Sequence, residues 1–461
     1  HRVLAINRGE KEECLKVGIV EDREAALAKV KAAHVKGDSI FRGLLEATAE
    51  DAYDRLIFPS IEREVRNELT DMANEQAIKM FEVNLRPLLM QPPLKGKTIL
   101  AVDPAYRTGC KIAVIDPSGN VLDTGVVYPT PPQNRVEEAK AKLKAMIKKH
   151  GVDVISIGNG TASKEAEIFV AELIKECDAR LSYAVVNEAG ASVYSASKLG
   201  AQEFPEFDVS IRSAVSIARR LQDPLAELIK IDVKSIGVGQ YQHDMNQKKL
   251  SEALGGVVED CVNKVGVDLN TASVSLLEYI SGISKTIAKN IVDYREENGK
   301  FTSRSQLLKV AKLGPKAFEQ CAGFMRISDG KNPLDATGVH PESYDATKAV
   351  LEKLGYTMED VKNRNVVGIS KKVSDYKELA DEAGVGEITL RDIVKELEKP
   401  ARDPREDMPK PILRSDVLEM KDLTPGMVLK GTVRNVIDFG CFVDIGVHQD
   451  GLVHILSLIH I

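Results

Sequence analysis

The sequence predicts a multidomain protein that is mainly α-helical, with one α/β domain and a partial all-β module near its C-terminal end. A chain of 461 residues exceeds what one hydrophobic core usually serves, so three or more domains are expected. Apolar residues return every three or four positions over 1–95, which is helical periodicity. Short apolar runs separated by turn residues begin at Lys97, and a second alternating stretch follows position 423.

These pattern changes divide the chain into a helical N-terminal region, an α/β domain, linking helices, two helical hairpins, an acidic helical segment, a linker and a β module. The expected boundaries are 1–95, 97–230, 231–265, 266–330, 331–400, 401–422 and 423–461. The first residue is His1 rather than Met, so we expect the N-terminal region to be truncated at its start.

Charge and cysteine usage restrict the class of protein. The net charge is −6, so a uniformly basic surface is excluded and any nucleic-acid contact must be local. Residues 271–330 carry nine Lys and Arg against six Asp and Glu, which makes this segment the first candidate. The six cysteines form no close pairs, and no apolar run is long enough to span a membrane. A cytoplasmic protein is therefore expected.

The α/β domain opens with the runs TILAVD, KIAVID and VLDTGVVYP, which predict a three-stranded meander. A helix (VEEAKAKLKAMIKKH), a strand (VISIGNG), a second helix, a strand (YAVVNE) and further helices follow. This order of elements is that of the ribonuclease-H-like fold.

Two short helical hairpins are predicted between 266 and 330, each with a glycine in a tight turn, at ISGIS and KLGPK. Such a turn exposes backbone N–H groups at a helix N-terminus, where phosphate is favoured. Both resemble the helix-hairpin-helix motif, whose turn has two glycines around a variable residue; Ser284 and Lys316 stand in for the second glycine. The candidate phosphate-binding residues are Gly282, Ser284, Lys285, Lys312, Gly314 and Lys316. The alternative is a hairpin pair that only packs domains together.

The stretches ILAVDPAYRTGCKIAVID, GNGTAS, VNEAGASVYSAS and QYQHD resemble the YqgF-type ribonuclease-H-like domain of the Tex family of bacterial transcription accessory proteins. The paired hairpins and the final β segment come in that family's order, so the resemblance covers nearly the whole chain. It implies a protein that binds nucleic acid, acts with the transcription machinery, including RNA polymerase as a partner, and has a non-catalytic ribonuclease-H-like domain.

Catalysis by a ribonuclease-H-like domain requires two divalent metals roughly 4 Å apart, held by carboxylates from the first strand, a later strand end and the last helix. Asp103 supplies the first, and Glu188 could supply the second or be a turn residue. The helix VSIRSAVSIARRLQ has no Asp or Glu and carries Arg212, Arg219 and Arg220 instead. We therefore predict that Asp103 and Glu188 are vestigial and that the domain is not an enzyme.

The final segment resembles the S1 RNA-binding module, an OB-type barrel of five strands that presents aromatic and basic side chains to single strands. Its alternation predicts three antiparallel strands, so the barrel is expected to be incomplete. The stacking candidates are Phe439, Phe442 and His454, any of which could instead fill the barrel core. Lys430 and Arg434 are the phosphate candidates.

The leading hypothesis is a scaffold that binds single-stranded RNA, DNA or both. Two alternatives remain open from the sequence. One is a metal-dependent nuclease or Holliday-junction-resolvase-like enzyme that uses Asp103 and Glu188; the other is a protein-interaction scaffold of the transcription machinery. The sequence has no P-loop or dinucleotide fingerprint and no histidine pair at metal-ligand spacing, so no cofactor, metal or small-molecule substrate is expected.

Overall fold

A computed structural model describes residues 1–177, 180–398, 403–408, 410–414, 423–429, 431–437, 439–445, 447 and 450–458. The chain divides into two units. The first comprises His1–Pro87 and Gly237–Val257, and the second comprises Leu88–Ile236 and Val258–Ile461. The candidate residues all lie in the second unit.

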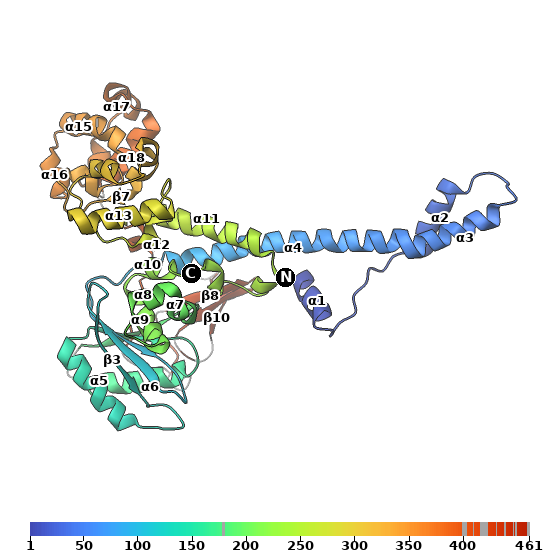
Figure 1. Cartoon of the computed structure of the whole chain (residues 1–461), viewed down its shortest axis with the longest axis horizontal. Helices are drawn as coiled ribbons and strands as arrows, with labels where there is room; N and C mark the ends of the chain where they lie inside the picture. Colours follow the sequence, from blue (N-terminus) through green and yellow to red (C-terminus); the bar gives the residue numbers. More distant parts are fainter. Residues whose placement is uncertain are drawn as a thin grey trace. The chain divides into compact units, whose positions relative to one another are not determined.

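The first unit is helical, as the periodicity predicts. Its N-terminal elements are α1 (Arg2–Lys11), α2 (Arg23–His34), α3 (Arg42–Ala52), the π-helical turn Tyr53–Ile57, and α4 (Phe58–Leu89), the long blue helix of Figure 1. α1 is held to α4 where the Arg66 guanidinium binds the Glu10 carboxylate and Asn7 donates to Thr70 at 2.9 Å. None of the helices in the described part of the chain is long and apolar enough to cross a membrane.

The α/β domain contains a five-stranded sheet in the order β3-β2-β1-β4-β5. The strands are β1 (Ile99–Asp103), β2 (Cys110–Ile115), β3 (Val121–Val127), β4 (Val154–Gly158) and β5 (Ser182–Val186). β1 pairs antiparallel with β2 and parallel with β4, with Ile99 opposite both Ile115 and Val154. The meander followed by parallel strands confirms the predicted ribonuclease-H-like order of elements.

Helices cover both faces of this sheet because its strands are apolar on both sides. Leu100, Val102 and Ile155 pack with α5 (Val136–His150) and α6 (Ser163–Lys175) on one face. Ile99 and Ala101 face the opposite side, where they pack against α9 (Val209–Gln222). The short helices α7 (Ala191–Ala196), α8 (Lys198–Glu203) and α10 (Pro224–Leu228) adjoin α9 (Figure 1).

The linking segment contains two 3₁₀ turns, Val233–Ser235 and Gln242–Asp244, and α11 (Gln247–Val265). The hairpin region then has α12 (Val274–Leu277), α13 (Lys285–Asn298) and α14 (Pro315–Cys321). The first arm of the second hairpin is a 3₁₀ helix, Arg304–Lys309, rather than the expected α-helix. Two short strands, β6 (Val267–Asp268) and β7 (Met325–Arg326), pair in parallel across the ends of this region.

The acidic segment is helical, as predicted, with α15 (Tyr344–Lys353), α16 (Met358–Lys362), α17 (Tyr376–Ala383) and α18 (Glu387–Glu398). Its own apolar core includes Leu334, Val350, Leu390 and Ile393. The buried Arg304 joins the hairpins to this segment, since its guanidinium donates to the carbonyls of Met325, Val339 and Thr337 and to the Tyr344 hydroxyl.

The linker contacts the α/β domain at two points. Arg405 binds Asp223 at 2.7 Å, and Arg414 exchanges two backbone hydrogen bonds of 2.7 and 2.8 Å with Tyr183 at the edge of the sheet. Beyond it lie β8 (Thr432–Ile437), β9 (Gly440–Asp444) and β10 (Gly451–His454), an antiparallel sheet in the order β10-β9-β8, followed by the short α19 (Ile455–Leu458). The three predicted strands are thus present.

Candidate nucleic-acid interface and acid pair

The carboxyl ends of three neighbouring strands bring two predicted residues together. Alternation along β1 places Asp103 on the same face as Ile99 and Ala101, which is the α9 face. Glu188 follows β5 two positions after Val186, another α9-face residue. Asp103 accepts a hydrogen bond from Ser213 of α9, and its charge acts on Glu188. The structure therefore assembles the expected acid pair beneath the last helix of the domain.

Two glycines make the space for the Glu188 carboxylate. A Cβ atom on Gly158 or on Gly160 would overlap the carboxylate oxygens of Glu188. The Glu188 backbone N–H donates to Asn159 Oδ1 at 3.0 Å, and the Gly160 N–H binds the carboxylate itself. The side chain is thus held in a slot that depends on the sequence G-N-G at 158–160.

Both acids have raised pKa values. Burial is the main cause for Asp103, offset in part by the Ser213 hydrogen bond and the charge of Lys111. Burial also raises the pKa of Glu188, and the neighbouring Asp103 charge raises it further. Two partly desolvated carboxylates that face each other oppose each other's ionisation.

The residues present do not fit a two-metal site. No group of three or more His, Cys, Asp or Glu side chains is placed to hold a metal ion among the residues that the structure describes. The helix position nearest Asp103 is Ser213, and the buried Arg220 lies further along the same helix. Asp223, just after α9, accepts from the Ala226 N–H as the cap of α10 and binds Arg405, so its carboxylate is engaged at a helix terminus.

The first hairpin turn has the expected glycine in the left-handed region, since Gly282 has φ +79°. Ile283 is buried and anchors the turn, and Ser284 caps α13 by accepting from the Ile287 N–H at 3.4 Å. Lys285 is the first residue of α13 and is exposed. The turn therefore presents the start of a 14-residue helix to solvent beside a lysine.

The second turn corrects the predicted register. Lys312, and not Gly314, has the left-handed conformation, with φ +67°, while Gly314 has φ −82°. The Gly314 carbonyl accepts from Phe318, as the Ser284 carbonyl accepts from Ala288, so Gly314 is the helix cap. Lys312 thus replaces the first glycine of the motif, and the second glycine is present; Lys316 is one residue beyond the first helical position.

A common framework holds the two turns. A Cβ atom on Gly282 would lie 2.8 Å from Cβ of Gln320 on α14, and Asn290 of α13 donates to the Ala311 carbonyl at 2.7 Å beside the second turn. Four lysines on this framework are exposed and form no ion pair with any described residue: Lys285, Lys289, Lys312 and Lys316. Lys289 was not among the residues predicted from the sequence, although it lies one helical turn after Lys285.

A third hairpin turn lies in the acidic segment and was not recognised from the sequence. It joins α17 to α18 through Gly384, Val385 and Gly386, and Gly384 has φ +70°. The Gly386 carbonyl accepts from Leu390 at 2.9 Å, which repeats the cap of the other two turns. The Gly-x-Gly spacing at 384–386 is the sequence feature that could have identified this turn. Glu387 begins the helix here, where the first hairpin has Lys285.

The C-terminal sheet brings the three aromatic candidates near one another. The rings of Phe439 and His454 have centroids 6.2 Å apart, and Phe439 is 48% exposed. Phe442 lies opposite Leu452 in the register, two positions from His454, so both share one face of the sheet. Lys430 and the side chain of Arg434 lie outside the described residues.

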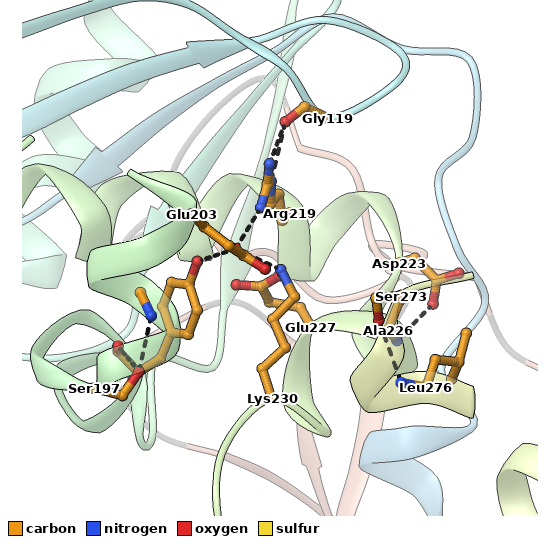
Figure 2. Close-up of polar contacts among 12 residues, drawn as sticks. Gly119, Ser197, Glu203, Arg219, Asp223, Ala226, Glu227, Lys230, Ser273 and Leu276 are labelled. Carbon is orange, nitrogen blue, oxygen red and sulfur yellow. Dashed lines mark hydrogen bonds and ion pairs between the residues drawn. The ribbon is translucent and has the colours of Figure 1, made fainter. Parts of the chain in front are cut away.

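A cavity of about 480 Å³ lies between the α/β domain, the hairpins and the linker. Arg219 and Lys230 line it, and Figure 2 shows their partners: the Arg219 guanidinium donates to the Gly119 carbonyl and binds Glu203, which also meets Lys230 at 3.0 Å. Lys230 also binds Glu227 at 2.9 Å. The arginine that the sequence placed in α9 thus serves this ion-pair network.

Family models match four parts of the chain. A Tex protein YqgF-like domain covers residues 97–222, and a helix-hairpin-helix motif covers 262–326. An HHH domain covers 332–405, and an S1 RNA binding domain covers 422–460. Fold and matches together define a multidomain protein assembled from nucleic-acid-binding modules.

Relatives match over 99% of the chain. It is 55% identical to the "Uncharacterized protein YdcI" of Bacillus subtilis, covering 64% of that protein. It is 48% identical to the "Transcriptional accessory protein Tex" of Neisseria gonorrhoeae and 47% identical to "Protein tex" of Bordetella pertussis, covering 60% and 59% of them. The chain spans less than two thirds of the length of these relatives, and over that length it is similar to proteins named Tex.

Proposed function

We propose that this chain is a transcription accessory factor that holds RNA, DNA or both through its two basic hairpin turns and its S1 strands, without cleaving them. The observation that carries the proposal is the set of four exposed, uncompensated lysines around Gly282 and Gly314. Positive side chains beside helix N-termini favour phosphate oxygens, and such contacts carry no sequence information. Binding is therefore expected to be strong at low salt and similar across sequences.

The S1 strands would add base stacking. The ring of Phe439, just before β9, lies near that of His454 on β10, and Phe442 shares a sheet face with His454. Base stacking on such aromatic side chains contributes about 1 to 3 kcal/mol per base. Lys430 and Arg434 are the phosphate contacts that we propose for this module from the sequence. This face favours single strands, since bases in a duplex are already stacked.

The ribonuclease-H-like domain would serve as a rigid centre. It contacts the linker through Asp223 and Tyr183, so it would hold the linker that precedes the S1 strands. We propose that RNA polymerase or the transcription complex is the partner, in keeping with the printed name of the Neisseria gonorrhoeae relative.

Binding and cleavage are tested together on the full chain. We expect labelled single-stranded RNA to bind with an affinity that falls steeply between 50 and 200 mM salt, by roughly tenfold or more. No cleavage is expected with magnesium or manganese. Cleavage that requires manganese and disappears in Asp103→Asn would establish a nuclease instead, and binding insensitive to salt would favour a protein-interaction scaffold.

The aromatic face has its own test. Phe442→Ala should weaken RNA binding by about 1 to 3 kcal/mol. Val436→Ala is the matched control, because Val436 is 74% exposed and pairs with Cys441, on the other face of the same sheet. Equal losses in both variants would contradict a stacking role for Phe442.

A further inference from the structure

Arg220 is the least exposed arginine around the acid pair, with 3% of its surface accessible. Its Nη1 donates to the carbonyls of Asn187 at 2.8 Å and Ala189 at 2.7 Å. These two carbonyls belong to the residues on either side of Glu188. The guanidinium is therefore fixed against the backbone of the loop that carries Glu188.

The remaining donors of Arg220 have no hydrogen-bond partner in the structure: its Nε and Nη2 are buried and unpaired, as is Oε2 of Glu188. Burial lowers the pKa of Arg220, and the negative charges of Glu227 and Glu188 oppose that effect. Glu227 already binds Lys230 at 2.9 Å. Arg220 thus lies within the field of Glu188 and retains unused donors.

Two buried cations of this chain act electrostatically on the acid pair, Lys111 on Asp103 and Arg220 on Glu188. Lys111, opposite Asp103 in the β1–β2 register, is buried, and its Nζ donates to Thr108 and to the Gly109 carbonyl. Asp103 and Glu188 thus have Lys111 and Arg220 as two fixed cations. A buried charge is tolerated when an opposite charge is nearby, and two divalent ions added to a neutral set would leave a large positive excess.

We propose that Arg220 is the built-in counter-cation of the Asp103–Glu188 pair and that its guanidinium, more than the lack of a third carboxylate, keeps divalent metal ions out. This inference rests on the proposal that the domain does not cleave nucleic acid. The helix geometry supports it: Ser213 and Arg220 are seven residues apart on α9, so they share a helical face, the one that Ser213 directs at Asp103.

Metal exclusion has two candidate causes, the Arg220 guanidinium and the missing third carboxylate. The metal affinities of wild type, Arg220→Gln, Ser213→Asp and the double variant separate them. Mn²⁺ binding to each full-length chain is measured by the loss of the free-ion electron paramagnetic resonance signal. We expect Arg220→Gln to bind Mn²⁺ at least about tenfold more tightly than wild type. Ser213→Asp alone should stay near wild type, and the double variant should bind most tightly.

Ser213→Asp binding as tightly as the double variant would overturn the proposal, because the third carboxylate alone would then suffice. Arg220→Gln and the double variant both remaining at the wild-type level would overturn it as well. Arg220→Lys retains the charge and should restore exclusion. Adding Asp103→Asn to Arg220→Gln should remove the gained affinity, which locates the ion at the acid pair.

A stability measurement keeps the proposal testable if the Arg220 variants do not fold. Glu188→Gln removes the partner of a buried cation, so it should lower the melting temperature, and millimolar Mn²⁺ should not restore it. In a metal site without its ion, the same substitution raises the melting temperature, because removing one of two repelling carboxylates stabilises the fold. A rise in melting temperature would therefore refute the counter-cation role. Glu206→Gln, an exposed acid on the same domain, is the control.

The same samples are tested for RNA binding. Failure of the wild type to bind RNA would refute the proposed function and leave the metal measurements intact. Normal RNA binding together with wild-type metal affinity in Arg220→Gln and the double variant would refute only the present inference.

Discussion

The hairpin turns at Gly282 and Gly384 have the same backbone and opposite chemistry. In each, a glycine with positive φ is followed by a partly or fully buried apolar residue and a capping residue whose carbonyl begins the helix. The first helix then starts with Lys285 and the other with Glu387. Residues 332–398 carry nine Lys and Arg against fourteen Asp and Glu, so the whole segment around Gly384 is acidic.

The comparison teaches that turn geometry alone does not define a phosphate site. A helix N-terminus contributes a modest attraction for an anion, and one carboxylate beside it can cancel that attraction. The Gly384 turn has the more regular glycine spacing and the less suitable charge. We therefore propose phosphate binding for the two basic turns only, and a packing role for the third.

The largest expected effect is charge reversal of the basic turns. Lys285→Glu combined with Lys316→Glu should weaken nucleic-acid binding by roughly a hundredfold for all sequences and lower the slope of log affinity against log salt by about 2. The control is Lys362→Glu with Lys377→Glu, the same charge change on exposed residues of the acidic segment. Loss of affinity for one sequence only would argue against phosphate contact.

A glycine-to-alanine series should show a graded loss of stability. Gly282→Ala introduces a left-handed alanine and a contact at 2.8 Å with Gln320, so about 2 kcal/mol is expected. Gly384→Ala has the same strain with nothing within 4 Å, so about 1 kcal/mol is expected. Gly314→Ala should be nearly neutral, because its φ is −82° and the space is open. Thermal unfolding measures the order, and a large loss at Gly314 would contradict the corrected register.

The smallest effect on nucleic-acid affinity is expected from replacing the acidic residue at the Gly384 turn with a basic one. Glu387→Lys places a lysine where the first hairpin has Lys285, and nucleic-acid affinity should rise by no more than about threefold, since the surrounding segment stays acidic. A rise as large as the loss in the lysine double variant would show that the Gly384 turn is itself a competent site. Glu359→Lys, away from the turn, is the matched control.

Much of the fold was predictable because each element has a local signature. Strand alternation and turn residues located the five strands of the α/β domain and the three strands at the C-terminal end. The same reasoning placed Asp103 and Glu188 at strand ends, and strand parity then put both beneath α9.

The remaining features depend on conformations or partners that the residue pattern does not reveal. Glycine marks a left-handed turn so often that Gly314 looked like the turn residue, whereas the structure has Lys312 there. The sequence shows Arg220 only as a position where a carboxylate is absent. Its hydrogen-bond partners lie 31 to 33 residues earlier in the chain, so the local residue pattern does not reveal them. The Gly-x-Gly spacing at 384–386 lies in an acidic segment, whose composition does not indicate a phosphate-binding turn.

The two contacts of the linker have a consequence for how tightly a long RNA would be held. Arg405 and Arg414 hold the linker that precedes the S1 strands to the domain that also adjoins the hairpins. Once one module has bound, the other meets the same strand at a local concentration set by this short connection, which for short linkers is in the millimolar range. Two weakly binding modules on one strand would then bind it together roughly 10² to 10⁴ times more tightly than either module alone. A strand too short to reach both modules would lose that gain entirely.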